Sequence, residues 1–463
     1  MDRRDFLKTV GLAGIASLTS RCSMGAAKKR PNILFMFADD QAQSCQGYAG
    51  NPIIQTPNMD RLAAEGVYFE NAFVTTAICC SSRASILTGQ YTRRHAITDF
   101  QKPLSAKAFA QSYPAILRKA GYRTGYLGKF AVGWPNKDIK RLSLPADKFD
   151  YWYGFGQMLN FEQKIDGESR YLTDVMTEKA LDFLRTNPAD QPFCLTIAFK
   201  EPHGPYSYFD PDFPDPYEGV TFPRAKTLTW DAYDKVPKFI RDSLNGTGDR
   251  LDQLENPESY QKSLRTVYSL ISRMDLAVGI IMAGLRTLGF DDNTIVIWAS
   301  DHGSLLGAHG LKGKWLMYEE SIRIPLIIRD GRQPSGLRAK RVDPMALNID
   351  LAPTMLDYAG VGIADCMQGK SLVPIVTGST KLLREDWYYE HFYEHQGRIR
   401  PSEGVRTTEW KYIRYPKQEP PFEQLFHLSK DPHELRNLAQ NADYAATLAR
   451  LRKRCNAYRQ QLV

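Results

Sequence analysis

Three runs of consecutive apolar residues stand out along the chain, and each leads directly into polar or charged residues. The runs are Pro31–Ala38, Phe193–Phe199 and Asn293–Ser300. Continuous apolar stretches of this length are typical of parallel strands that are buried on both faces. Shorter strands are predicted at Arg123–Tyr126 and Pro325–Ile328. The pattern therefore predicts a large, mainly parallel sheet.

Between these runs, apolar positions recur with helical spacing. The predicted helices span Asn58–Glu65, Tyr113–Ala120, Tyr171–Thr186 and Leu264–Leu288. Strands that alternate with helices indicate an α/β fold in which helices cover both faces of the sheet. A chain of 463 residues is long enough for one large domain and a smaller one. We expect the large, catalytic domain to span residues 28–380.

From about Lys381 the pattern changes, and short aromatic and β-branched segments replace the long apolar runs. These segments are Trp387–Tyr393, Gly404–Thr408 and Trp410–Tyr415, and a helical pattern follows near Ala445–Gln461. We expect residues 381–463 to form a small antiparallel sheet with one helix packed on it. Tyr206–Asn256 is rich in Pro, Asp and aromatic residues, which predicts a long ordered loop near the functional site.

The first 27 residues are typical of an export signal rather than of a folded element. Asp2–Lys8 contains two adjacent arginines and resembles a twin-arginine signal, while the apolar Thr9–Leu18 is too short to span a bilayer. Cys22 leaves lipid anchoring as an alternative, but Arg21 directly before it fits that signal poorly. No later run approaches the roughly 20 apolar residues of a membrane helix, so no transmembrane segment is expected. The predicted location is periplasmic or extracellular.

Charge and cysteine content narrow the function classes. Lys and Arg number 60 against 52 Asp and Glu, a formal net charge of +8, which suits an anionic substrate because a positive field concentrates anions. Nucleic acid is not an expected partner, because the chain has no basic–aromatic stripe and no RNP-like run. The seven cysteines are too scattered for a disulfide scaffold, and no CxxC pair indicates zinc. The adjacent pair Cys79-Cys80 rarely forms its own disulfide, because that geometry is strained.

The segment that begins at Cys79 offers a chemical explanation for the adjacent cysteines Cys79 and Cys80. Cys79–Gly89 has the pattern C-x-x-S-R-x-x-x-L-T-G and resembles the signature of the formylglycine-dependent sulfatases, within the alkaline-phosphatase-like superfamily. The resemblance implies that superfamily's fold. It also implies that a formylglycine-generating maturase oxidises Cys79 to formylglycine (3-oxoalanine), whose hydrate attacks the sulfur of a sulfate ester. Two small cysteines packed at a helix start are the structural alternative.

Acidic residues follow two of the predicted buried strands, where α/β proteins place their sites. Asp39 and Asp40 follow the first strand, and Asp301 and His302 follow the strand that ends at residue 300. By resemblance, these four residues and Cys79 are the metal ligands. Carboxylate oxygens favour Ca²⁺. Since a nitrogen ligand such as His302 is unusual for calcium, Mg²⁺ or Mn²⁺ is the alternative.

Four further residues fit sulfuryl transfer, in which fixed cations stabilise the charge that spreads over the equatorial oxygens. By resemblance, Arg83 orients the formylglycine, while Lys129 and Lys314 contact it or the sulfate. His203, within Glu201–Pro205, matches the histidine that meets the bridging oxygen or the sulfate, where a protonated imidazole assists the leaving alkoxide. Taken alone, each lysine would be a solvated surface charge.

Two positions depart from the family pattern. Ala131 stands where the family's G-K-x-H segment has a histidine that helps to collapse the hemiacetal sulfate, and Ser81 stands where Pro or Ala is usual. These departures keep a non-catalytic protein that binds sulfated glycans as an alternative. A phosphodiesterase or phosphonate monoester hydrolase of the same superfamily is another. The lysine and histidine positions favour the sulfatase.

The resemblance extends to the C-terminal part, where Glu423–Glu434 and Asn437–Ala439 look like the family's ending. The pattern thus spans nearly the whole mature chain. Six residues are candidates for substrate binding, because they resemble those with which glycan sulfatases hold the sugar. An equally good explanation is that they belong to an exposed strand and loop without such a role. These substrate-binding candidates are Glu390, His391, His395 and Arg398, with His95 and Asp99 after the signature helix. Export of such an enzyme indicates a sulfated polysaccharide or its oligosaccharides as substrate. The sugar, the sulfate position and exo or endo action stay open.

Overall fold

The computed structural model describes residues 29–134, 143–156, 159–165, 167–204, 213–246, 254, 256–334 and 340–462. Pro31–Val463 forms one compact unit. The predicted export signal, residues 1–27, lies outside the described residues, as does Cys22 with its alternative of a lipid anchor.

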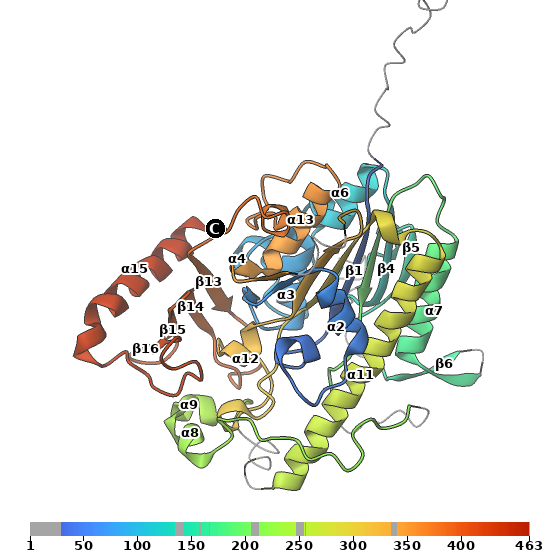
Figure 1. The fold of residues 1–463 in the computed structure, drawn as a ribbon. Coiled ribbons are helices and arrows are strands. Elements are labelled where there is room, and N and C mark those ends of the chain that lie inside the picture. Colours follow the sequence, from blue (N-terminus) through green and yellow to red (C-terminus); the bar gives the residue numbers. More distant parts are fainter. Residues whose placement is uncertain are drawn as a thin grey trace, which may run out of the picture. The chain divides into compact units, whose positions relative to one another are not determined.

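An eight-stranded sheet runs through this unit, in the order β11-β2-β10-β9-β1-β8-β4-β5. Figure 1 labels three of its strands, β1, β4 and β5. In its parallel part, β1 lies between β8 and β9, and β4 and β5 continue beyond β8. The bounds are β1 Asn32–Ala38, β8 Phe193–Ala198, β9 Thr294–Ser300, β4 Arg123–Lys129 and β5 Tyr151–Phe155. Every residue of β1, β8 and β9 is buried, which explains their continuous apolar sequences. The predicted mainly parallel sheet is confirmed.

The other edge of the sheet is mixed. The strands there are β10 (Leu326–Asp330), which runs antiparallel to β9, β2 (Val67–Phe69) and β11 (Lys340–Val342). The β10 prediction is confirmed. β2 and β11 escaped prediction because three residues are too few to show alternation, and β11 is largely exposed.

Alternate side chains of β1 enter two separate cores, one on each face of the sheet. Ile33 and Phe35 belong to one core, and Leu34 and Met36 to the other. The first core includes helices α3 (Cys79–Thr88), α6 (Tyr113–Lys119) and α13 (Leu351–Tyr358), and the second includes α2 (Pro57–Ala64), α7 (Leu172–Arg185) and α11 (Pro257–Thr287). The expected sandwich of helices around the sheet is therefore confirmed.

Helix α11 starts two turns earlier than predicted. Its first turns are polar, so the apolar period did not reveal them, but Asn256 caps them by accepting hydrogen bonds from the N–H groups of Glu258 (3.0 Å) and Ser259 (3.4 Å). By length and hydropathy the helix could cross a membrane, yet 61% of its most apolar window is buried inside the protein. It packs against α7 and α2. These contacts are those of a core helix in a globular domain.

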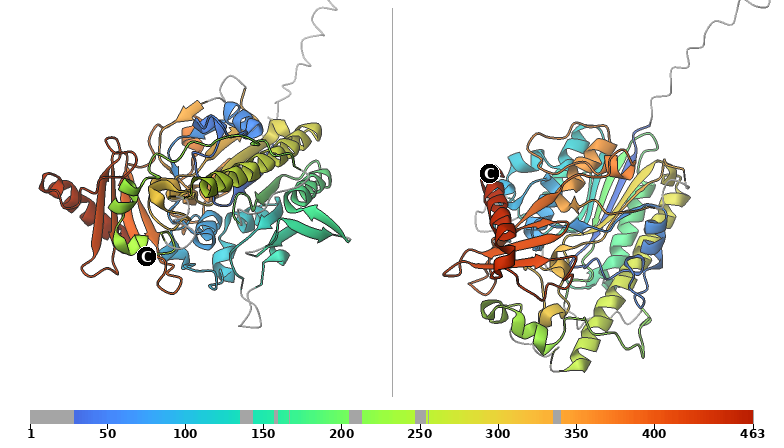
Figure 2. Two further views of the ribbon diagram at one scale, coloured as in Figure 1. Left: turned by 90° about the horizontal axis from the view of Figure 1, so that it is seen from below. Right: turned by 60° about the vertical axis from the view of Figure 1, so that its left-hand side comes forward.

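The C-terminal part forms a separate four-stranded antiparallel sheet (Figure 2). Its strands are β13 (Asp386–His391), β14 (Ser402–Thr407), β15 (Trp410–Tyr415) and β16 (Phe422–His427), and α15 (Ala445–Gln461) packs on β14 and β15. The predicted sheet and helix are confirmed, and β16 is an addition. The fully buried Lys411 of β15 joins the sheet to the rest of the unit through its ion pair with Glu319 (2.8 Å), and it also pairs with Glu434 of the C-terminal part (2.7 Å).

The segment Tyr206–Asn256 is more regular than predicted. Its described part contains two short helices, α8 (Trp230–Lys235) and α9 (Lys238–Arg241), so the prediction of a loop was wrong there. Thr229 caps α8 by accepting a hydrogen bond from the N–H of Ala232 (3.2 Å). Residues 205–212, 247–253 and 255 lie outside the described part.

Candidate active site

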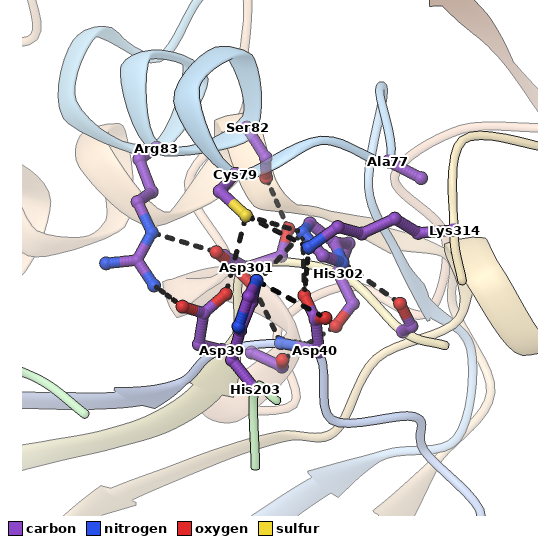
Figure 3. Close-up of polar contacts among 12 residues, drawn as sticks. Asp39, Asp40, Ala77, Cys79, Ser82, Arg83, His203, Asp301, His302 and Lys314 are labelled. Atoms are coloured by element: carbon purple, nitrogen blue, oxygen red, sulfur yellow. Dashed lines mark hydrogen bonds and ion pairs between the residues drawn. The ribbon is translucent and has the colours of Figure 1, made fainter. Parts of the chain in front are cut away.

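The signature segment forms α3, whose ten residues are all buried. The helix begins at Cys79 and ends where Gly89 takes a left-handed conformation (φ 65°) and donates its N–H to Ser85 O (2.8 Å). The two cysteines point to different surroundings. Cys80 belongs to the apolar core, whereas Cys79 Sγ faces a cluster of charged side chains (Figure 3). Only Cys79 of this pair therefore lies in a reactive environment.

The cluster forms because neighbouring parallel strands end at the same edge of the sheet. Asp39 and Asp40 follow β1, Asp301 and His302 follow β9, and Lys129 is the last residue of β4. The chain turns sharply after β1, and the Asp40 N–H donates to Asp301 Oδ1 (3.1 Å). The strand ends thereby bring together residues that lie far apart in the sequence.

Cys79 Sγ is surrounded by four polar groups. Lys314 Nζ lies 3.2 Å away, His302 Nε2 3.3 Å, Asp39 Oδ1 3.5 Å and Lys129 Nζ 3.6 Å. Burial, with a further contribution from the negative charge of Asp39, raises the pKa of the Cys79 thiol to about 12. An unmodified Cys79 would thus stay protonated at neutral pH and would be a poor nucleophile.

Three buried carboxylates are paired with three buried cations. Lys129 pairs with Asp39, Lys314 with Asp40 (2.5 Å), and Arg83 with Asp301 (2.8 Å). Burial alone would raise the pKa of Asp39, but nearby cations, Lys129 above all, hold it well below its usual value. The pairing is required because an unpaired buried charge is costly.

The same residues provide a donor set for a divalent metal. Ligand atoms of Asp39, Cys79, Asp301 and His302 all lie within 4.8 Å of one another, and Asp40 belongs to an overlapping group. His302 Nδ1 is held by Gly303 O (2.9 Å), which leaves Nε2 facing the cluster. Buried carboxylate oxygens are the ligands that hard divalent cations prefer, so the residues present fit such an ion.

His203 approaches the cluster from the loop after β8. Its Nε2 lies 3.9 Å from Asp40 Oδ2, and its Nδ1 lies 3.0 Å from Gly204 O. Burial lowers the pKa of His203, although the charges of Asp40 and Asp39 oppose that change. His203 is therefore placed at the pocket, with its orientation fixed by the backbone.

A cavity of about 270 Å³, the catalytic pocket, opens above these residues. Cys79, Lys129, His203 and Lys314 line its polar part. The wall, which sequence analysis missed, is mostly apolar and consists of Ile78, Phe100, Leu244, Trp315, Tyr393 and Ile399, with His395 beside them. Trp315 follows Lys314 directly and Phe100 follows Asp99, so their positions next to predicted site residues could have identified both. Nothing in the local sequence marks Leu244.

The substrate-binding candidates separate into three groups. His395 lines the pocket, and Asp99 lines a cavity next to it. Glu390, His391 and His95 are instead buried and line neither cavity among the described residues. Glu390 pairs with Arg93, His391 Nε2 lies near Tyr393 O, and His95 Nε2 near Ser85 Oγ. Arg398 is exposed, and its carbonyl accepts a hydrogen bond from the N–H of Leu244 (2.8 Å).

A sequence profile of the sulfatase family matches residues 31–361, which contain the whole charged cluster. The chain belongs to the sulfatase family. A second profile, that of the N-sulphoglucosamine sulphohydrolase C-terminal region, matches residues 307–461 of this sulfatase. N-acetylglucosamine-6-O-sulfatase of Bacteroides thetaiotaomicron is 31% identical, over 90% of this chain and 84% of its own. Human N-acetylglucosamine-6-sulfatase is 28% identical, over 91% and 83%.

Solved structures confirm the alkaline-phosphatase-like fold of the sulfatase. A protein bound to its substrate D-glucosamine-2-N,6-O-disulfate superposes with a TM-score of 0.82 at 27% identity, over 94% of this chain and 98% of that one. A phosphonate monoester hydrolase of Agrobacterium radiobacter superposes with a TM-score of 0.80 at 23% identity, over 94% and 96%. At that identity the second likeness concerns the fold alone.

Proposed function

We propose that this protein hydrolyses 6-O-sulfate esters on glucosamine units of a glycan, with Cys79 in its formylglycine form as the nucleophile. The observation that carries the proposal is the convergence of Lys129, Lys314 and His203 on Cys79 in one pocket. The sugar is inferred from relatives, which are named for N-acetylglucosamine 6-sulfate or were solved with a 6-O-sulfated glucosamine. The proposal requires both the modification and the cationic pocket.

In the first step, one hydroxyl of the hydrated formylglycine gives its proton to Asp39, whose Oδ1 lies 3.5 Å from Cys79 Sγ, and attacks sulfur, and the bond from sulfur to the sugar oxygen breaks. The leaving oxygen takes a proton from the protonated imidazole of His203. Lys129 and Lys314 stabilise the negative charge on the equatorial sulfate oxygens. In the second step the other hydroxyl gives its proton to the His203 imidazole, which the first step left neutral, and sulfate departs with the bonding electrons of the C–O bond. The aldehyde that forms again adds water to restore the hydrate, and Asp39 returns its proton to solvent.

Asp39, Asp40, Asp301 and His302 would hold the divalent metal, which we propose is Ca²⁺ because most of the donors are carboxylate oxygens. When bound, such an ion supplies positive charge that polarises sulfate oxygens. Ala131, which follows β4 and is buried, supplies no base for the second step. Among the described residues, the imidazoles that line the pocket belong to His203 and His395.

A peptide mass spectrum across Cys79 is the experiment that tests the nucleophile. In protein from a host that has a formylglycine-generating maturase, the peptide containing Cys79 should be about 18 Da lighter than the unmodified sequence, because an aldehyde replaces the thiol. Fragment ions should assign the loss to Cys79 and leave Cys80 unchanged. An intact thiol in a host that matures other sulfatases would contradict the proposal and favour a glycan-binding protein without catalysis.

We also propose that the protein is exported, to the periplasm or beyond, through its twin-arginine segment. Replacing Arg3 and Arg4 by lysine should retain the protein in the cytoplasm, as fractionation and immunoblotting would measure. Arg21→Lys is the matched control and should leave export intact. Unchanged export of the double variant would refute this route. If Cys22→Ala releases the protein from a membrane fraction, the lipid-anchored alternative holds instead.

A further inference from the structure

A second cavity of about 650 Å³, here called the outer cavity, adjoins the catalytic pocket. Phe100, Tyr393 and His395 line both cavities. The rings of Phe100 and Tyr393 meet edge to face at 5.9 Å, and the Tyr393 hydroxyl lies 3.0 Å from His395 Nδ1. Tyr393 thus contacts both of the other residues, and the three together form the boundary between the two cavities. The outer cavity is therefore the space next to the catalytic pocket into which a larger substrate could extend.

The catalytic pocket is small for such a substrate. Its volume of about 270 Å³ lies just below the range of roughly 300–1,000 Å³ that is usual for sites of drug-sized ligands. One sulfated sugar unit would fill this space if its sulfate lay at Lys129 and Lys314 and its C–H faces lay against the apolar wall. A linked unit would then lie outside the catalytic pocket.

The outer cavity has the chemistry of a site for hydroxyl groups. Two carboxylates, Asp99 and Glu394, and two amides, Gln101 and Gln396, line it beside aromatic rings. Asp99 Oδ1 accepts hydrogen bonds from the N–H groups of Gln101 (2.8 Å) and Lys102 (3.0 Å), while the contact of Oδ2 within the described part of the chain is a long one with Thr98 Oγ1 (3.4 Å). Asp99 Oδ2 can therefore accept a hydrogen bond from a sugar hydroxyl.

The same cavity is unsuited to a second anion. Among the described residues, no lysine or arginine lines it. Two lysines contact lining residues without belonging to the lining: Lys102 Nζ donates to Thr98 Oγ1 (2.7 Å), and Lys417 Nζ pairs with Glu394. A sulfate or a uronate carboxylate placed in the cavity would lie beside the carboxylates of Asp99 and Glu394, with no lysine or arginine of the described lining to pair with it.

We propose that the outer cavity is a subsite for an uncharged sugar linked to the sulfated unit, and that it discriminates against glycans with an anionic group on that neighbour. This inference rests on the proposed function, because it assumes that the sulfated unit occupies the catalytic pocket. It names the substrate class more closely: glycans in which the 6-O-sulfated glucosamine is followed by a neutral residue.

Three substrates test the inference with the mature enzyme. They are 6-O-sulfated N-acetylglucosamine itself, the same unit linked to galactose, and the same unit linked to glucuronate. The kcat/KM for sulfate release should be about tenfold higher with the galactose-linked substrate than with the glucuronate-linked one, by like-charge repulsion near the surface. Equal or higher kcat/KM with the glucuronate-linked substrate would overturn the inference, while release from the monosaccharide would still support the proposed function. No release from any of the three would overturn both.

Two double variants test whether the outer cavity causes the preference for the galactose-linked substrate. Asp99→Asn with Glu394→Gln removes both charges with little change of shape, and should reduce the preference to within about twofold. Asp190→Asn with Glu409→Gln removes the same two charges from exposed positions that line neither cavity, and should keep the preference. A preference that survives in the first double variant, or disappears in the second, would show that the outer cavity does not select the neighbour.

Discussion

Replacing Cys79 by alanine is expected to lower the rate of sulfate release by a factor on the order of 10⁴ to 10⁶, the usual cost of removing a covalent nucleophile. No other described side chain in the catalytic pocket can replace it: Lys129, Lys314 and His203 lack an oxygen or sulfur, and the Tyr393 hydroxyl, 3.0 Å from His395 Nδ1, cannot form a geminal diol that later expels sulfate. Sulfate release from 6-O-sulfated N-acetylglucosamine, followed by ion chromatography, is the measurement.

Cys80→Ala is the matched control for this prediction. Cys80 is the same residue type at the next position of the same buried helix, but its side chain lies in the apolar core. Its loss should therefore lower the melting temperature and leave the rate of sulfate release nearly unchanged. Near-normal turnover by Cys79→Ala, or equal loss in both variants, would refute the role of Cys79. Circular dichroism should show that both variants are folded.

Asp301→Ala is expected to abolish metal binding and to lower turnover at least about 100-fold, because several kcal/mol of charge stabilisation disappear with the ion. Asp301 belongs to the donor group and also pairs with Arg83 at 2.8 Å, with both side chains fully or almost fully buried. The variant should therefore also lose about 3–5 kcal/mol in the free energy of unfolding. Elemental analysis of the purified protein measures the metal directly.

Asp350→Ala separates the loss of the ligand from the loss of stability. Asp350 is fully buried and pairs with Arg384 at 2.6 Å, but it belongs to neither donor group. This variant should be destabilised to a similar degree and still hold the metal while it is folded. Metal content that is unchanged in Asp301→Ala would contradict the ligand assignment. If chelated wild-type enzyme regains activity with Mg²⁺ or Mn²⁺ but not with Ca²⁺, the proposed identity of the ion is wrong.

The helices and strands that sequence analysis found are those with a strong local pattern. β1, β8 and β9 were identified because each is buried on both faces and so is apolar throughout. α15 was placed at its observed bounds because the buried Leu448, Leu451 and Cys455 recur at helical spacing among polar residues. The elements that were missed lacked such a pattern, since β2 and β11 have three residues each and the first turns of α11 are polar.

Sequence by itself determined the family, the nucleophile candidate and the acidic residues after β1 and β9, because each of these is encoded in a short contiguous segment. The roles of these residues stay predictions, although the structure does bring Cys79, Lys129, His203 and Lys314 to one pocket. The tertiary structure alone decided which substrate candidates reach that pocket. Glu390 and His391 lie on β13 with their side chains buried, whereas His395, a few residues later, lines the pocket.

The residues that form the wall of the pocket could not be predicted from the sequence either, because they meet only in the folded protein. Phe100, Leu244, Trp315 and Tyr393 come from four segments, and no local signal reports that they meet. Their proximity follows from the packing of the C-terminal sheet beside the signature helix, where the Glu390 N–H donates to Thr75 O (3.1 Å). Chemistry that resides in one residue type can be read from sequence, but the shape of a cavity is a property of long-range packing.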